Sequence, residues 1–187
     1  MKYLALILVH FLGCSRPFYY VDYREPAGEF SVKVPWGWAL EEHGRFSRRP
    51  YAEVTWLGKL VDSHEGIPIG VMLSIKRLDR NPGPGYRKDF AAAEAELFSG
   101  KPVPGATITT GTASGFPARW VSNDDWAQYK GDGLFHGPVK KFPSRLRAFV
   151  IRTPEAYYVL DYKAVNEHFD SHKPAFDTLV ASFKLKP

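Results

Sequence analysis

The sequence predicts a single α+β domain, in which an antiparallel β-sheet is flanked by helices. Two observations carry this prediction. Three pairs of strand-like segments are each joined by a short connection, and helix-like segments lie between two of these pairs and at the C-terminus. A length of 187 residues is ordinary for one domain, and no internal repeat is visible.

The first predicted strand spans residues 29–34. Its apolar and polar residues alternate, as expected for a strand that buries one face. The apolar positions are Phe30, Val32 and Val34. The sequence Pro-Trp-Gly-Trp at residues 35–38 predicts a turn that ends the strand and places aromatic side chains against the edge of the core.

Two longer strands are predicted at residues 52–61 and 67–78. A short polar connection joins them, which indicates a hairpin. Each strand has an apolar face, made of Val54, Trp56 and Leu60 in one and of Ile67, Ile69, Val71, Leu73 and Ile75 in the other.

A helix is predicted at residues 86–99, before the stop signal Gly100. Its apolar residues fall on one stripe, and these are Tyr86, Phe90, Ala93 and Leu97. Two further hairpins follow, the first from residues 103–113 and 116–122 and the second from residues 144–153 and 156–164.

The C-terminal helix is predicted to begin at Pro174, because proline suits the first position of a helix. Apolar residues follow at helical spacing, and these are Phe176, Leu179, Val180 and Phe183. A helix beginning there excludes His168 and His172, so the two imidazoles are not expected to align as a zinc pair.

Composition excludes several classes of protein. The chain is 44% apolar and 15% aromatic with a formal net charge of +5, which is too apolar for a disordered chain. One cysteine permits neither an intramolecular disulfide nor a thiolate cluster. No apolar run approaches the roughly 20 residues of a membrane-spanning helix.

Residues 1–13 are typical of a secretory signal, because Lys2 precedes an apolar stretch at residues 4–12. The segment Phe11-Leu12-Gly13-Cys14 resembles the end of a bacterial lipoprotein signal. The resemblance implies that the Cys14 thiol takes diacylglycerol and that its new amino group is acylated, for example with palmitate. An ordinary secretory cleavage after Ser15 and an uncleaved buried strand are the alternatives.

Residues 14–28 are predicted to be the lipidated N-terminus and a tether, and residues 29–187 the domain. The aromatic segment at residues 18–23 has two interpretations. It rests at the lipid headgroups, or it forms an early strand packed on the domain. The resemblance implies a lipid-anchored protein of the bacterial cell envelope, and Ser15 favours the outer membrane where two membranes are present.

Two stretches resemble the beginning and the end of a PsbP-like domain, which is an α/β/α sandwich. The first is the strand of residues 30–34 with its Pro-Trp-Gly-Trp turn, and the second is residues 156–164 with residues 169–184. These are packing motifs. The resemblance therefore implies a fold, together with the non-enzymatic character of the bacterial lipoproteins in that family, and assigns no activity.

No catalytic constellation is found, and we expect neither an enzyme nor a metal or other cofactor. A Gly-x-Ser-x-Gly motif is absent, and an exported chain does not meet nucleic acid routinely. The acidic pair Asp124 and Asp125 lacks the spacing of a calcium loop.

Residues 122–143 have no periodicity, and structureless connections of this length are usually functional or disordered. The aromatic side chains of this stretch either pack onto the sheet or bind a partner. The stretch supplies the candidate partner-binding residues Trp126, Tyr129, Phe135 and His136. The predicted function is a membrane-anchored, non-enzymatic protein that binds another envelope component. The alternative is a small-molecule or ion binder, or a hydrolase, with a cleft near residues 122–143.

Overall fold

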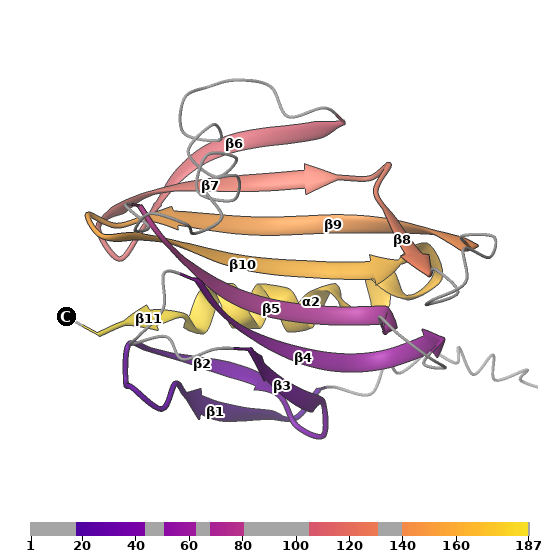
Figure 1. The fold of residues 1–187 in the computed structure, drawn as a ribbon, viewed down its shortest axis with the longest axis horizontal. Coiled ribbons are helices and arrows are strands. Elements are labelled where there is room, and N and C mark those ends of the chain that lie inside the picture. The colour runs from indigo at the N-terminus through magenta and orange to yellow at the C-terminus, as the bar shows by residue number, and fades with distance from the viewer. Residues whose placement is uncertain (1–17, 44–50, 63–67, 81–104, 131–139, 187) are drawn as a thin grey trace, which may run out of the picture.

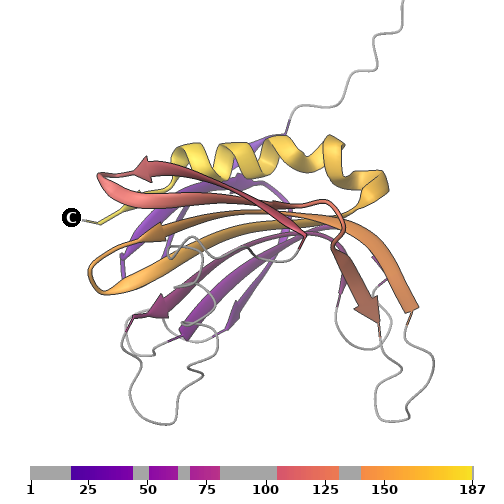
Figure 2. The same cartoon turned by 90° about the horizontal axis from the view of Figure 1, so that it is seen from above.

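The computed structural model describes residues 18–43, 51–62, 68–80, 105–130 and 140–186. An eight-stranded antiparallel sheet is covered on one face by helix α2 (Asn166–Ser182) and by a three-stranded sheet (Figures 1 and 2). This arrangement confirms the predicted α+β class. The signal segment, Cys14 and the predicted helix at residues 86–99 lie outside the described residues.

The order of the large sheet is β3 (Ala39–His43), β4 (Tyr51–Asp62), β5 (Ile69–Asp79), β10 (Ala156–Val165), β9 (Lys140–Arg152), β7 (Phe116–Asn123) and β6 (Ala106–Ala113). Strand β8 (Ala127–Lys130) pairs with the beginning of β9. The small sheet contains β1 (Tyr20–Arg24), β2 (Phe30–Pro35) and β11 (Lys184–Leu185). The three predicted hairpins are confirmed as β4–β5, β6–β7 and β9–β10.

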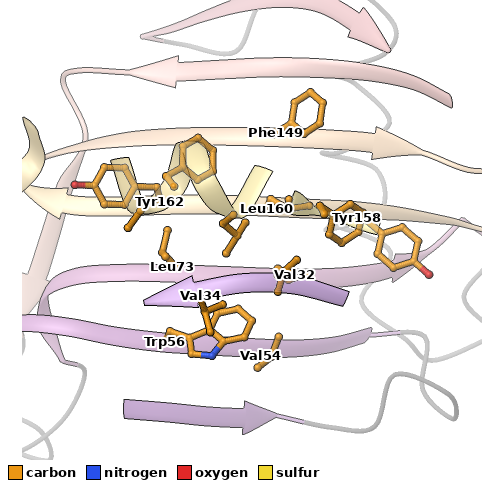
Figure 3. Packing of buried hydrophobic residues seen from close by; sticks show 14 of the residues in the cluster. Val32, Val34, Val54, Trp56, Leu73, Phe149, Tyr158, Leu160 and Tyr162 are labelled. Carbon is orange, nitrogen blue, oxygen red and sulfur yellow. The ribbon is translucent and has the colours of Figure 1, made fainter. Parts of the chain in front are cut away.

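The main core lies between the large sheet and the layer formed by α2 and β2 (Figure 3). Alternation along each strand sends one set of apolar side chains into it. The labelled members are Val32, Val34, Val54, Trp56, Leu73, Phe149, Tyr158, Leu160 and Tyr162. A smaller apolar cluster occupies the opposite face of the large sheet and contains Leu78, Val121, Ala148, Val150, Tyr157 and Val159.

One predicted core position is wrong. Leu60 is 37% exposed, although Val54 and Trp56 on the same predicted face are buried. The register of β4 against β5 shifts between Leu57 and Asp62, and such an irregularity re-aims the side chains beyond it. Gly70 on β5 permits the backbone of β4 to come close at this point, because a Cβ atom at residue 70 would lie 2.3 Å from the Lys59 carbonyl oxygen.

Of the two interpretations of the aromatic segment at residues 18–23, the structure supports an early strand packed on the domain. Tyr20–Arg24 form β1, which pairs antiparallel with β2 from Tyr20 opposite Pro35 to Arg24 opposite Ser31.

Strands β3 and β11 are absent from the sequence prediction. The first is rich in charge (Ala-Leu-Glu-Glu-His), and the second has only two residues, so neither carries a clear alternating pattern.

Helix α2 begins eight residues before the predicted start at Pro174, which lies inside the helix. Tertiary packing accounts for the additional turns. Phe169 is buried in the main core, its ring centroid lies 4.9 Å from that of Tyr162, and its carbonyl oxygen accepts a hydrogen bond from the Tyr162 hydroxyl at 2.6 Å. These contacts offset the backbone hydrogen bond that a proline inside a helix removes.

Candidate functional site

The connection at residues 122–143 is predicted to be structureless, and for residues 127–130 and 140–143 this prediction is wrong. Strand β8 pairs with β9 in a regular antiparallel ladder, from Ala127 opposite Pro143 to Lys130 opposite Lys140. The short polar strand escaped detection because four residues show too little alternation. The candidate residues Phe135 and His136 lie outside the described residues.

Two candidate residues are described on this hairpin. Tyr129 lies on β8 and is 53% exposed, whereas Trp126 is half-buried, with the Lys163 ammonium 5.6 Å from its ring centroid. Between them, the buried Gln128 amide bonds to both the backbone N–H and the carbonyl oxygen of Gly70. These bonds hold β8 against β5, so the hairpin presents the Tyr129 ring from a fixed backbone.

The acidic residues of this region do not converge on a cation. The Asp124 carboxylate pairs with Arg147 at 2.7 Å, and the side chain of Asn123 accepts a hydrogen bond from the Asp125 backbone N–H. Across the described ranges, no group of three or more His, Cys, Asp or Glu side chains is placed to hold a metal ion.

The prediction that His168 and His172 do not align is wrong, because both lie on α2. Their ring centroids are 5.9 Å apart. The Nδ1 atom of His172, however, lies 3.0 Å from the His168 carbonyl oxygen and 2.9 Å from the Ser171 hydroxyl. Burial lowers the pKa of His172. The ring is therefore engaged with its own helix rather than directed at a ligand.

A hollow of about 450 Å³ lies at the end of the molecule where the C-terminal strand and the β9–β10 turn meet. Its lining residues are Ala27, Glu29, Arg77, Phe116, Thr153, Pro154, Glu155, Tyr158, Leu185 and Lys186. None of them belongs to residues 122–130. The hollow is thus separate from the hairpin on which a cleft was predicted.

Two charged groups of this hollow, Glu29 and Arg77, pair with each other. The Tyr158 hydroxyl donates to Glu29 at 3.2 Å, and Arg77 lies 3.4 Å from Glu29 and 2.6 Å from Asp79. Burial raises the pKa of Tyr158 to about 12, so its phenol stays protonated near neutral pH. Among the described residues that line it there is no serine, cysteine or histidine, the residue types that usually supply the nucleophile and the base of a hydrolase.

A different surface exposes aromatic side chains where the described chain begins. Tyr19 is 79% exposed and Trp36 is 71% exposed. The two residues are neighbours across β1 and β2, and the Trp36 backbone N–H donates to the Tyr19 carbonyl oxygen at 2.7 Å. Val21 on β1 and Leu40 on β3 are also exposed. We call these four residues the N-terminal edge.

The turn at residues 35–38 was predicted to pack its aromatic side chains against the core, and this holds for one tryptophan of the two. Trp38 packs over Gly58, where an added Cβ would lie 2.7 Å from the indole ring, and against Phe18. Between the two tryptophans, Gly37 has φ +82°, a left-handed conformation that favours glycine. The exposed Trp36 is the residue that sequence reasoning missed, because its turn motif does not distinguish a packed ring from an exposed one.

No helix within the described residues is long and apolar enough to cross a membrane. No family model and no curated protein sequence matches the chain. The chain is similar in structure to several solved proteins.

The solution structure of CyanoP, the cyanobacterial PsbP protein of Synechocystis, matches with a TM-score of 0.50 and 12% identity, over 89% of this chain and 92% of that one. The yeast Ran-binding protein Mog1p matches at 0.45 and 10% identity, over 90% and 96% of the two chains. LpqN, involved in cell envelope biogenesis of Mycobacterium tuberculosis, matches at 0.37 and 15% identity, over 91% and 92%. The match to CyanoP concerns the fold alone, and the chain has the PsbP-like α+β fold that its terminal motifs predict.

Proposed function

We propose that this protein is a lipid-anchored, non-enzymatic component of the bacterial cell envelope that binds another envelope component. The observation that carries the proposal is the position of the chain's one cysteine. Cys14 ends an apolar segment of the secretory type, and the described strands begin six residues later at Tyr20.

The chemistry of the anchor supports this proposal. Each buried methylene group adds about 0.8 kcal/mol to membrane affinity, and a single chain binds only marginally. A diacylglycerol thioether on Cys14 with an acylated amino group supplies three chains. The anchor then needs no membrane-spanning helix. The residue after the cysteine, Ser15, favours outer-membrane placement within this proposal.

The partner surface in this proposal is the β8 hairpin with Trp126 and Tyr129. Tyrosine and tryptophan are enriched at binding interfaces, and an exposed ring on a held strand loses little conformational freedom on binding. Gln128 supplies that restraint through its two hydrogen bonds to Gly70.

Metabolic labelling tests the anchor. Cells that express the full chain are fed a fatty-acid analogue, and the protein is expected to carry the label and to sediment with membranes. The Cys14→Ser variant is expected to lose both properties. Unchanged membrane attachment of that variant contradicts the anchor.

Photocrosslinking in intact cells tests the partner surface. A photoreactive phenylalanine replaces Tyr129 on the hairpin, and the same group at the exposed Glu155, which lies on the β9–β10 turn, serves as the control. One discrete crosslinked product is expected from position 129 and not from position 155. Equal patterns from both positions count against the hairpin as the partner surface.

A further inference from the structure

We propose that the N-terminal edge (Tyr19, Val21, Trp36 and Leu40) lies in the headgroup region of a phospholipid bilayer, and that it orients the hollow at Glu29 and Tyr158 away from the membrane. The inference deepens the proposed function, because it rests on the anchor at Cys14 and adds a surface, a ligand and an orientation.

The two aromatic side chains of the N-terminal edge are highly exposed. The side chains of Tyr19 and Trp36 have the largest exposed fractions among the exposed large apolar residues of the described chain. Tyrosine and tryptophan are the residues that gather at membrane interfaces, since each combines an apolar ring with a polar group that stays hydrated.

The strand register gathers the four residues at one end of the molecule. Tyr19 and Trp36 continue the β1–β2 ladder beyond Tyr20 opposite Pro35. The turn at Trp36 leads directly into β3, whose second residue is Leu40. In Figure 1, β1, β2 and β3 lie together at the bottom of the view.

Strand β1 and strand β3 also approach each other directly. The Tyr23 hydroxyl donates to Glu42 at 2.8 Å, and the Tyr23 ring meets that of Trp56 edge-on at 5.1 Å. Val21 precedes Tyr23 by two residues, and Leu40 precedes Glu42 by two, so each lies on the same face as its neighbour. The exposed Val21 and Leu40 therefore lie on two strands that the Tyr23–Glu42 hydrogen bond holds together.

Chain length ties this edge to the anchor. Tyr19 follows Cys14 by five positions, and an extended chain spans at most about 3.6 Å per position, or about 18 Å in all. A lipid on Cys14 therefore keeps Tyr19 within about 18 Å of the bilayer surface. Among the described residues, Tyr19 is the exposed aromatic residue nearest to Cys14 in sequence.

Charge identifies the kind of attraction. The carboxylates of Asp22, Glu41 and Glu42 are exposed on the same two strands, so the edge is not a cationic patch. Its affinity for lipid must come from the burial of aromatic and apolar surface, which salt screens little. Contact with the bilayer is therefore expected to persist when salt is added and when the anionic lipid is left out.

The orientation follows from β2. Glu29, at the hollow, precedes this strand, and Trp36, at the edge, follows it, so about 20 Å of extended chain separates the two sites. With Trp36 at the headgroups, the hollow faces the aqueous phase.

Two matched labels measure this orientation in the full chain. Ala39→Cys places a thiol on β3 beside the edge, and Ala27→Cys places one at the hollow, and both alanines are exposed. Because the native thiol carries lipid, the added cysteine alone reacts with a fluorophore. The protein is reconstituted into vesicles of phosphatidylethanolamine and phosphatidylglycerol that contain a headgroup nitroxide lipid. The nitroxide is expected to quench the label at position 39 and not the label at position 27.

A variant pair then tests the aromatic side chains. Tyr19→Ser with Trp36→Ser is expected to abolish quenching at position 39, while Trp120→Phe, which changes an exposed tryptophan on β7, leaves quenching unchanged. The replaced side chains are solvent-exposed, so far-UV circular dichroism is expected to remain that of the unmodified chain.

A Cys14→Ser background separates this inference from the anchor. If the chain with native Cys14 takes up no fatty-acid label, while quenching at position 39 in the Cys14→Ser background still depends on Tyr19 and Trp36, the anchor is overturned and the lipid surface is kept. If the chain with native Cys14 is labelled but its quenching is equal at positions 39 and 27, the inference is overturned and the anchor is kept. Quenching that disappears at high salt contradicts the aromatic nature of the contact.

Discussion

Asp161 is a carboxylate in the middle of the large sheet, with only 3% of its surface exposed. Burial alone would raise its pKa, but the ammonium groups of Lys163 and Lys76 and hydrogen bonds from Lys76 and Ser74 outweigh that effect and lower the pKa to about 2. A charged residue at the centre of a sheet is tolerated here because the neighbouring strand β5 and β10 itself supply its partners.

This network predicts a pH dependence. The folded-state pKa of Asp161, about 2, lies below its ordinary value of 3.8, so ionised Asp161 stabilises the fold above about pH 4, and this contribution is lost as the pH falls towards 2. Urea unfolding at a series of pH values is expected to show the decrease, and Asp161→Asn is expected to flatten it in this interval.

The same substitution is expected to lower the free energy of unfolding at pH 7 by about 3 kcal/mol, because it leaves Lys76 and Lys163 without their buried counterion. The control is Asp170→Asn, which removes an exposed partner of Arg145 and is expected to have a much smaller effect. Similar losses for the two variants would show that the Asp161 network contributes nothing particular.

Gly70 carries a second prediction at the scale of one residue. An added Cβ would lie 2.3 Å from the Lys59 carbonyl oxygen, and φ at this residue is +156°. Gly70→Ala is therefore expected to destabilise the fold by about 1–3 kcal/mol. Gly111→Ala is the matched control, since its Cβ would meet Trp120 at an ordinary 3.9 Å. Chemical denaturation of both variants compares the two positions, and equal midpoints would exclude the clash.

At the scale of the element, helix α2 is held by the residues that it buries rather than by its ends. Its N-cap residue, Val165, makes no capping hydrogen bond through its side chain, and the last turn contains no basic residue. Phe176 stacks on Tyr162 at 5.9 Å, and Phe183, directly after the helix, lies 5.6 Å from Phe30 on β2. The aromatic contacts join the helix to both sheets.

These contacts predict the cost of truncating either ring. Phe176→Ala and Phe183→Ala are each expected to lower the free energy of unfolding by about 3–5 kcal/mol, through lost burial and the cavity left behind. Asp177→Ala removes only a surface ion pair with Lys173, and a loss of about 0.5 kcal/mol is expected. Losses under 1 kcal/mol for the two phenylalanines would place the helix at the periphery of the fold.

At the scale of the whole molecule, stability is expected to decrease from the centre of the large sheet to its edges. Strand β10 is hydrogen-bonded to β5 on one side and to β9 on the other, and α2 packs across it (Figure 2). Strands β3 and β6 end the sheet. The amides of β10 are therefore expected to exchange with solvent only on global unfolding.

Amide hydrogen exchange followed by mass spectrometry checks this order. Peptides from β10 are expected to be the slowest of the described strands, and those from β3 and β6 are expected to exchange faster by local opening. Equal protection of edge and centre would mean that the sheet opens as a single unit.

The sequence predicted what depends on local periodicity. Three hairpins have strong alternation and short connections, and all three were predicted within a few residues of their observed bounds. The Cys14 hypothesis also needs no fold, because a signal segment is recognised as a linear sequence. The hypothesis that Tyr129 binds a partner also depends only on the residues of one short segment. The strand that presents Tyr129 was not predicted.

Only the tertiary structure decided what depends on partners distant in sequence. Helix α2 extends to Asn166 because Phe169 meets Tyr162, Leu60 turns outward because β4 shifts register against β5, and Trp36 is exposed while Trp38 packs over Gly58. In each case the local pattern permits two outcomes, and a neighbour brought close by folding selects one. The sequence therefore determined the class of the fold and the hypothesis of a lipid anchor, and the packing determined which aromatic side chains remain exposed beside that anchor.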